Sequence, residues 1–224
     1  MSEQKKQPKY PNEIFIRSYP KIIFFWPLLI TSFILWLIEA FTNNADISGT
    51  LGIVWFIVFF TNIFITAFDF SSTKFFVLIL AVVIVLLLVV FLVPGLFANL
   101  SGLSIDLTLT WQFYFVMTLI LLFILGIVVL STRFEYYKIE RNEIIHKSGI
   151  FSSAERFPVK SLRFKKEIPD VFEFFLLRAG SITIDPGHAD EVKILPTVLN
   201  INKVEKNLDW LLSHVSVEPD ELDQ

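Results

Sequence analysis

Four long apolar stretches occupy the middle of the chain and constrain its fold more than any other feature. A bilayer core about 30 Å thick requires about 20 mostly apolar residues in a helix that rises about 1.5 Å per residue. Four segments meet this requirement: residues 22–41, 51–68, 75–93 and 111–130. A cleaved signal peptide is the alternative for the first segment, but its apolar core would be shorter and a small-residue cleavage site should follow. We therefore predict an uncleaved four-helix transmembrane domain over residues 22–130.

The distribution of charge agrees with this prediction and excludes an ordinary soluble enzyme. Of the 19 Lys and Arg residues in the 224-residue chain, only Lys74 lies between positions 22 and 132. The acidic residues of the same region are Glu39, Asp46, Asp69 and Asp106. The chain has no Cys, which excludes a disulfide framework and a metal site built on thiolates.

Basic residues flank the predicted spans on one side only. Several lie in the N-terminal segment, residues 1–21, and others follow the fourth span from Arg133 onward, with Lys74 between the second and third spans. The gaps at 42–50 and 94–110 contain no Lys or Arg. Short cytoplasmic flanks of membrane proteins are enriched in Lys and Arg. Both termini are therefore predicted to be cytoplasmic.

The spans carry little chemistry of the kind that transporters use. Glu39 lies at the outer edge of the first span, where we favour a solvated boundary residue over a transport group. Asn62 is the most conspicuous polar residue inside a span and is a candidate interhelix contact, because a neighbouring helix would satisfy its amide. Pro27 either kinks the first helix or lies at its start. Paired helix interruptions are missing, so a carrier is disfavoured, while a passive conduit stays open as an alternative.

After residue 130 the pattern changes to alternating apolar and polar residues with turns. We predict a small antiparallel module over residues 131–216 and a solvated acidic tail over 217–224. The predicted strands are residues 132–139, 143–150, 156–162 with a continuation over 163–168, 181–185 and 191–195. The apolar run 171–178 is compatible with either a helix or a strand. The last two strands are expected to pair as a hairpin.

The module is predicted to end in an amphipathic helix over residues 202–215. Its apolar positions recur at spacings of three and four: Ile201, Val204, Leu208, Leu211, Leu212 and Val215. This stripe must cover other apolar surface. Asn202 is the predicted N-cap, with Glu205 reaching back to the backbone of the cap.

The module resembles the bacterial membrane-anchored pleckstrin-homology-like (PH-like) domain family. The resemblance rests on residues 131–134 (STRF), 145–151 (IHKSGIF), 156–162 (RFPVKSL), 172–184 and 195–212, and it contains no catalytic motif. It implies a barrel of two near-orthogonal antiparallel sheets with a C-terminal capping helix, in a bacterial inner-membrane protein with a binding or assembly role. The expected fold is thus an α+β membrane protein, with four transmembrane helices followed by a PH-like β-barrel or sandwich.

The densest basic group of the module is a candidate contact for lipid or a partner. It consists of Lys160, Arg163, Lys165 and Lys166, although a simple solvated face is the favoured interpretation. The phosphoinositide-binding pattern of eukaryotic relatives cannot be carried over, because glutamates interrupt the basic residues of the first hairpin. No motif predicts a catalytic, metal or cofactor-binding residue.

The leading hypothesis is therefore a multi-pass inner-membrane scaffold or adaptor that is not an enzyme. It would use no cofactor, lie among membrane lipids, bind no nucleic acid, and assemble as a homo-oligomer or with another membrane protein. The alternatives are a transport or conduit component and a sensor of anionic lipid.

Overall fold

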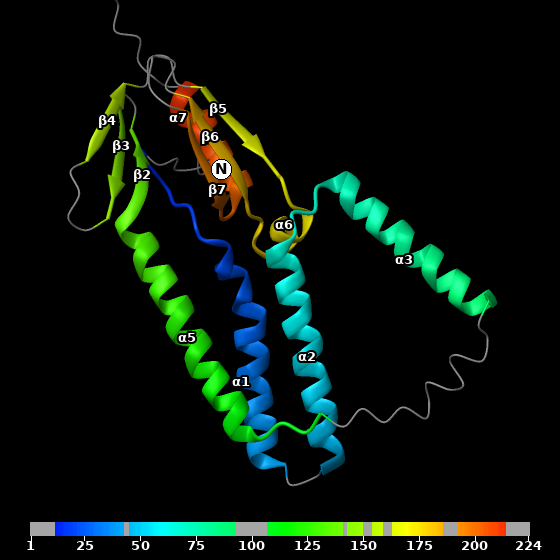
Figure 1. Ribbon diagram of the computed structural model, residues 1–224. Coiled ribbons are helices and arrows are strands. Elements are labelled where there is room, and N and C mark those ends of the chain that lie inside the picture. Colours follow the sequence, from blue (N-terminus) through cyan, green and yellow to red (C-terminus); the bar gives the residue numbers. More distant parts are fainter. Residues whose placement is uncertain are drawn as a thin grey trace, which may run out of the picture. The chain divides into compact units, whose positions relative to one another are not determined.

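The chain forms two compact units, seen in a computed structural model that describes residues 12–42, 45–92, 107–140, 143–149, 154–158, 163–185 and 192–213 (Figure 1). The helical unit comprises Pro20–Val128 and Ile168–Leu176. The strand unit comprises the described residues of Met1–Tyr19, Val129–Glu167 and Leu177–Gln224. The chain therefore leaves the strand unit and returns to it twice.

The helical unit contains the predicted spans. Its helices are η1 (Lys21–Phe25), α1 (Trp26–Phe41), α2 (Ala45–Ala67), α3 (Ser72–Leu92) and α5 (Trp111–Phe134), the last continuing into the strand unit. Among the described residues, four helical segments are long and apolar enough to cross a membrane. This finding confirms the prediction of a multi-pass membrane protein.

The structure resolves the open choice at Pro27 and shifts several predicted boundaries. Pro27 lies in the first turn of α1, where its missing N–H leaves no helical hydrogen bond unmade, so it does not interrupt the span. Helix α2 begins at Ala45, well before the predicted residue 51, because polar residues at the end of a span are compatible with a helix. Helix α5 runs to Phe134, so the strand predicted from residue 132 was wrong in its first three residues. The alternation of apolar and polar residues that suggested a strand begins before the end of α5. It therefore could not show where the helix ends and the strand begins.

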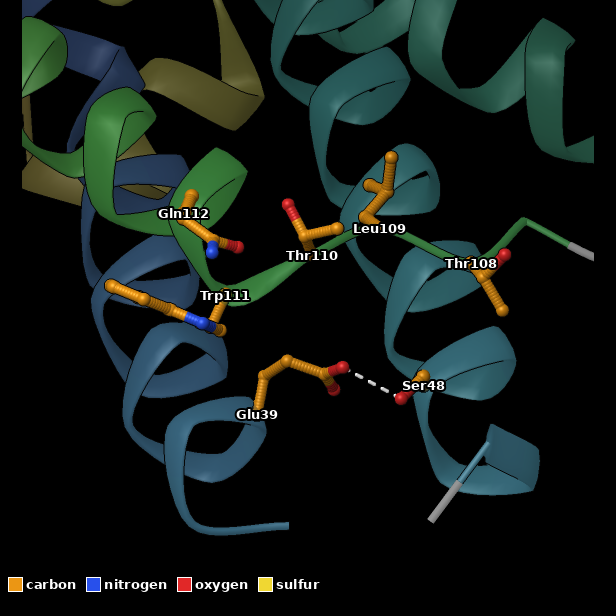
Figure 2. Close-up of a pocket in the computed structure, with 7 residues that line it drawn as sticks. All are labelled: Glu39, Ser48, Thr108, Leu109, Thr110, Trp111 and Gln112. Carbon is orange, nitrogen blue, oxygen red and sulfur yellow. Dashed lines mark hydrogen bonds between the residues drawn. The ribbon is translucent and has the colours of Figure 1, made fainter. Parts of the chain in front are cut away.

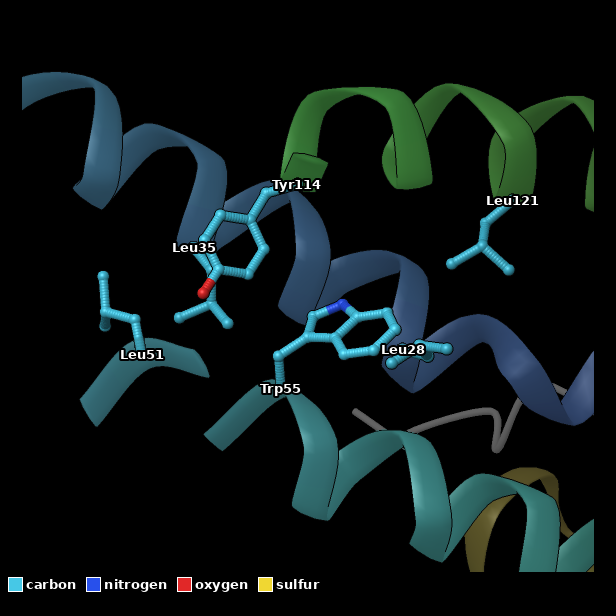
Figure 3. Close-up of a cluster of buried hydrophobic side chains, with 6 residues drawn as sticks. All are labelled: Leu28, Leu35, Leu51, Trp55, Tyr114 and Leu121. Carbon is cyan, nitrogen blue, oxygen red and sulfur yellow. The ribbon is translucent and has the colours of Figure 1, made fainter. Parts of the chain in front are cut away.

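Side chains from α1, α2 and α5 build the core of the helical unit (Figure 3). The cluster consists of Leu28, Leu35, Leu51, Trp55, Tyr114 and Leu121. Trp55 is its centre: its ring stacks on Phe59 with centroids 5.1 Å apart, and its Nε1–H donates to Ser32 Oγ at 2.8 Å. A buried hydrogen bond between α1 and α2 thus satisfies both polar groups inside an apolar cluster. Helix α3 contributes no buried side chain.

The strand unit holds two antiparallel sheets and a C-terminal helix. Its elements are β1 (Ile14–Ile16), β2 (Glu135–Ile139), β3 (Glu143–Ser148), β4 (Glu155–Pro158), β5 (Arg163–Glu167), β6 (Gly180–Asp185), β7 (Lys193–Val198) and α7 (Ile201–Ser213). One sheet has the order β1-β2-β3-β4 and the other β5-β6-β7. The α+β class and the predicted final hairpin are confirmed, the latter by the pairing of Ile182 with Leu195.

Strand β1 is the element that the sequence analysis missed. It lies before the first span yet pairs with β2, which follows the fourth, through registers such as Ile14 with Ile139. Ile14 and Ile16 are buried in the strand unit. Just beyond β1, Ser18 forms a bridge with Val198, joining this edge to the second sheet. A segment of only three residues gives too short an alternation to stand out from the sequence.

Helix α7 buries three residues of the predicted apolar stripe, while Val204 and Leu212 are half-buried and Val215 lies outside the described residues. Ile201, Leu208 and Leu211 are buried, and the helix packs against β1. The helix begins at Ile201, so the predicted N-cap at Asn202 was wrong. Asn202 and Glu205 instead both accept hydrogen bonds from Lys166 of β5, at 3.1 Å and 2.5 Å. The side chains of Asn202 and Glu205 thus bind Lys166 of the neighbouring strand, and do not bind the backbone at the start of the helix as predicted.

The apolar run at residues 171–178, for which the sequence allowed a helix or a strand, forms a helix, α6 (Val171–Leu177). Its residues up to Leu176 group with the helical unit, although the sequence analysis had placed them inside the module that begins at residue 131. Apolar rings explain this grouping, because Phe172 packs edge-on against Phe70 and Phe75 at centroid distances of 5.4 Å and 5.2 Å.

We expect the substitution Ile16→Ala to destabilise the strand unit. Ile16 is fully buried, so its truncation removes apolar contacts and leaves a cavity that costs about 3 kcal/mol. The measurement is thermal unfolding of the full-length protein in detergent. Ile194→Ala is the matched control, because Ile194 is 66% exposed, and equal melting temperatures for the two variants would contradict a structural role for β1.

Candidate functional site

The predicted basic group is only partly within the described residues, since Lys160 lies outside them. Arg163, Lys165 and Lys166 lie on β5, where Lys166 is half-buried and the other two are exposed. Lys165 Nζ lies 2.5 Å from Glu167 Oε1, and this hydrogen bond raises the pKa of the lysine. Lys166 is paired with Glu205 as described above. Two of the three described cations are thus matched by glutamates, which lowers the attraction of this strand for anionic lipid.

Asn62 is buried in α2 but bonds within its own helix. Its Nδ2 donates to the carbonyl of Val58 at 2.9 Å, while its Oδ1 has no hydrogen-bond partner within the described part of the chain. The interhelix contact proposed for Asn62 stays a prediction. The structure does show a hydrogen bond between two helices, from Trp55 to Ser32. The sequence did not indicate it, because a Trp within an aromatic-rich span is expected to contribute apolar contacts.

Asp170 is a buried carboxylate that joins α6 to the connection between α2 and α3. It is 1% exposed, and its Oδ2 accepts from the N–H of Phe70 at 2.5 Å. Its Oδ1 accepts from the N–H groups of Phe172 and Glu173 at 2.7 Å and 3.0 Å, which is how an N-cap satisfies the free donors of a first helical turn. The N–H of Val171 donates to the carbonyl of Phe70 at 3.0 Å, so the two segments bind each other reciprocally.

A second buried carboxylate lies one turn further along α6. Glu173 is 2% exposed, and its Oε1 lies 3.2 Å from Lys21 Nζ, which also contacts Asp69. Burial raises the pKa of Glu173, and the nearby Lys21 ammonium opposes part of that rise. Lys21 thus contacts two carboxylates, and nothing in the sequence spacing of the three residues indicates this contact.

A pocket of about 300 Å³ lies within the helical unit, where α1 ends and where α2 and α5 begin (Figure 2). It is lined by Glu39, Ser48, Thr108, Leu109, Thr110, Trp111 and Gln112. Ser48 Oγ donates to Glu39 Oε1 at 2.6 Å, which ties α1 to α2. Oε2 of the same carboxylate is buried and has no hydrogen-bond partner among the described residues.

Gly52 of α2 holds the segment that forms one wall of the pocket. A Cβ atom at this position would lie 1.7 Å from the carbonyl oxygen of Leu107, so any larger residue would displace that backbone. Thr108 and Leu109, which follow Leu107, lie beside α2, and the chain then enters α5 at Trp111 (Figure 2). The glycine was unremarked in the sequence because it sits inside an apolar span.

The pocket combines one carboxylate, Glu39, with the neutral polar side chains of Ser48, Thr108, Thr110 and Gln112 and with the indole of Trp111 (Figure 2). Across the described ranges, no three His, Asp or Glu side chains gather to hold a metal ion. The sequence analysis favoured Glu39 as a solvated boundary residue; the structure places it, half-buried, in the lining of a pocket near the end of α1, and the boundary interpretation stays a prediction.

Comparisons with known proteins assign nothing to this chain. No protein-family model matches it, no curated protein matches it, and no solved structure matches it. Any function must therefore be argued from the residues and their geometry.

We expect Asp170→Ala to loosen α6 from the helical unit. The change leaves the N–H groups of Phe70, Phe172 and Glu173 without their acceptor, at a cost of about 2 to 4 kcal/mol. Hydrogen exchange of these amides, followed by mass spectrometry, should accelerate. Asp209→Ala, which removes an exposed carboxylate from α7, is the control. Unchanged exchange at Phe70 would show that Asp170 does not hold the two segments together.

Glu173 should make stability depend on pH in a defined direction. A carboxyl whose pKa is raised by folding stabilises the protein most where it is protonated, and this contribution is lost as pH rises through the raised pKa. Glu173→Gln stays neutral and escapes that loss. The melting temperature of the variant relative to wild type should therefore be higher at about pH 7 than at about pH 4. A difference that shrinks with rising pH would mean that pairing with Lys21 outweighs burial.

Proposed function

We propose that this protein is a multi-pass inner-membrane scaffold or adaptor that presents a cytoplasmic PH-like domain for self-association or for binding another membrane protein. The observation that carries the proposal is the strand unit itself. Its two antiparallel sheets and closing helix α7 support the proposal, because the PH-like resemblance implies two antiparallel sheets with a C-terminal helix, although β1 comes from the segment before the first span. Folds of this kind serve many functions, so the fold supports a binding role without identifying the ligand.

The pairing of β1 with β2 supports the placement of both flanks on one side of the membrane. These strands precede the first span and follow the fourth, and their backbone hydrogen bonds can form only in a common compartment. An even number of spans meets this condition. The basic residues of both flanks favour the cytoplasm as that compartment.

The surface of α3 is compatible with an assembly role. None of its side chains is buried, and bulky residues such as Phe76 and Phe91 are 69% and 78% exposed. Lipid or a second protein can cover this apolar surface equally well. The anionic-lipid alternative is weaker, because Lys165 and Lys166 are already paired with glutamates.

We expect the protein to leave its native membrane as a discrete complex. Native mass spectrometry after gentle detergent extraction should give a multiple of 25.9 kDa or a stoichiometric partner. Because the chain has no Cys, single cysteines placed along α3 report its neighbours without background. Cross-links that recur every three to four positions along α3 would identify a helical interface. Ile194→Cys in β7, outside the membrane, is the control and should not follow this pattern. A monomer without cross-links or partner would contradict the scaffold.

A further inference from the structure

The pocket at Glu39 contains an acceptor that lacks a donor. Its Oε1 is satisfied by Ser48, but Oε2 is buried and has no hydrogen-bond partner within the part of the chain described. A buried polar atom left without a partner costs about 1 to 3 kcal/mol, and more when it carries charge. A bound donor from outside the chain would remove this cost.

The basic residues of the membrane region do not supply that donor. Lys74 is the only Lys or Arg between residues 22 and 132. It lies in the first turn of α3, after the C-terminal end of α2, whereas Ser48 of the pocket lies at the N-terminal end of α2. A helix of this length extends about 30 Å, so the two positions lie at opposite ends of α2. The pocket is therefore an anionic site without a resident counter-charge from this region.

The residues that line the pocket favour an organic ammonium ion over a metal ion. Hard metal ions prefer several oxygen ligands and retain water, which suits neither a single carboxylate nor the apolar surfaces of Leu109 and Trp111. An organic ammonium group gains from an adjacent indole ring through cation–π attraction. A primary ammonium has three N–H donors, and the lining offers Glu39 together with Thr108 and Thr110, the last of which also accepts from the N–H of Phe113 at 3.4 Å.

We propose that this pocket binds a primary ammonium group, supplied either by the headgroup of an aminophospholipid or by a small free amine. A volume of about 300 Å³ lies at the lower end of the range for small-molecule sites and suits a group of the size of ethanolamine. The inference is independent of the scaffold proposal, because it concerns helix ends of the helical unit and no residue of the strand unit.

The test compares lipids on the full-length protein. Delipidated protein in detergent is incubated with phosphatidylethanolamine, phosphatidylcholine or phosphatidylglycerol of identical acyl chains, and retained lipid is counted by native mass spectrometry. The first two share the phosphate and the positive charge, but only phosphatidylethanolamine has N–H donors. We expect its retention to exceed that of the other two by about tenfold, a difference of about 1.4 kcal/mol. Equal retention of the three lipids would overturn the proposal.

Variants locate the binding in the pocket. Glu39→Gln keeps the side-chain shape and removes the charge, and it should reduce phosphatidylethanolamine retention about tenfold. Glu135→Gln, at an exposed carboxylate of β2, should retain the lipid as wild type does. Gly52→Ala displaces the wall at Leu107 without changing a lining side chain, and should also weaken binding. Wild-type retention by Glu39→Gln would refute the assignment.

Two further arms separate the sources of the ammonium group and guard against misfolding. Free ethanolamine should raise the melting temperature of wild type, but not of Glu39→Gln, if the ligand is a small amine. Retention of the lipid without any effect of ethanolamine identifies the headgroup of a membrane lipid. If Glu39→Gln does not unfold cooperatively, Trp111→Leu replaces it under the same criterion, because Trp111 is 44% exposed and its truncation leaves the helix core intact.

Discussion

The backbone pairing of β1 with β2 is the constraint on which the rest of the structure depends. It joins a strand that precedes every span to a strand that follows every span, so the two flanks of the helical unit belong to one folded body. Without β1, the long edge of β2 would lose its hydrogen-bond partners and the strand unit would lose the buried Ile14 and Ile16. The bridge from Ser18 to Val198 extends the same connection to the second sheet.

Buried carboxylates perform a corresponding role in the helical unit. Asp170 satisfies backbone donors in two segments that lie far apart in the sequence, and such charge-assisted hydrogen bonds are among the stronger contacts in a protein. Glu173 adds a charge that Lys21 partly compensates. The segment 168–176 is thereby held to the spans, although the residues on either side of it belong to the strand unit. The hydrogen bonds of Asp170 and the packing of Phe172 against Phe70 and Phe75 act together in holding this segment to the helical unit.

The sequence predicted the features that arise from long patterns and missed those that arise from single contacts. Apolar length identified the four spans, and a regular stripe identified α7 with Leu208 and Leu211 inward. Strand β1 is too short to show a period, and Gly52 serves a backbone approach that only the folded chain reveals. The pocket at Glu39 is assembled from three helix ends, so no local motif could indicate it. The basic residues of β5 were visible, but the pairing of Lys166 with Glu205 depends on the position of α7.

The interrupted strand unit also has a consequence for how the protein is made. A chain emerges from the ribosome in order, so Ile14 appears long before Ile139, and every span is synthesised between them. During that interval β2 does not yet exist, so the sheet closes only after the last helix of the helical unit has been synthesised. A chain halted part-way would therefore display an unpaired strand edge, and such an edge is a template for pairing with other chains.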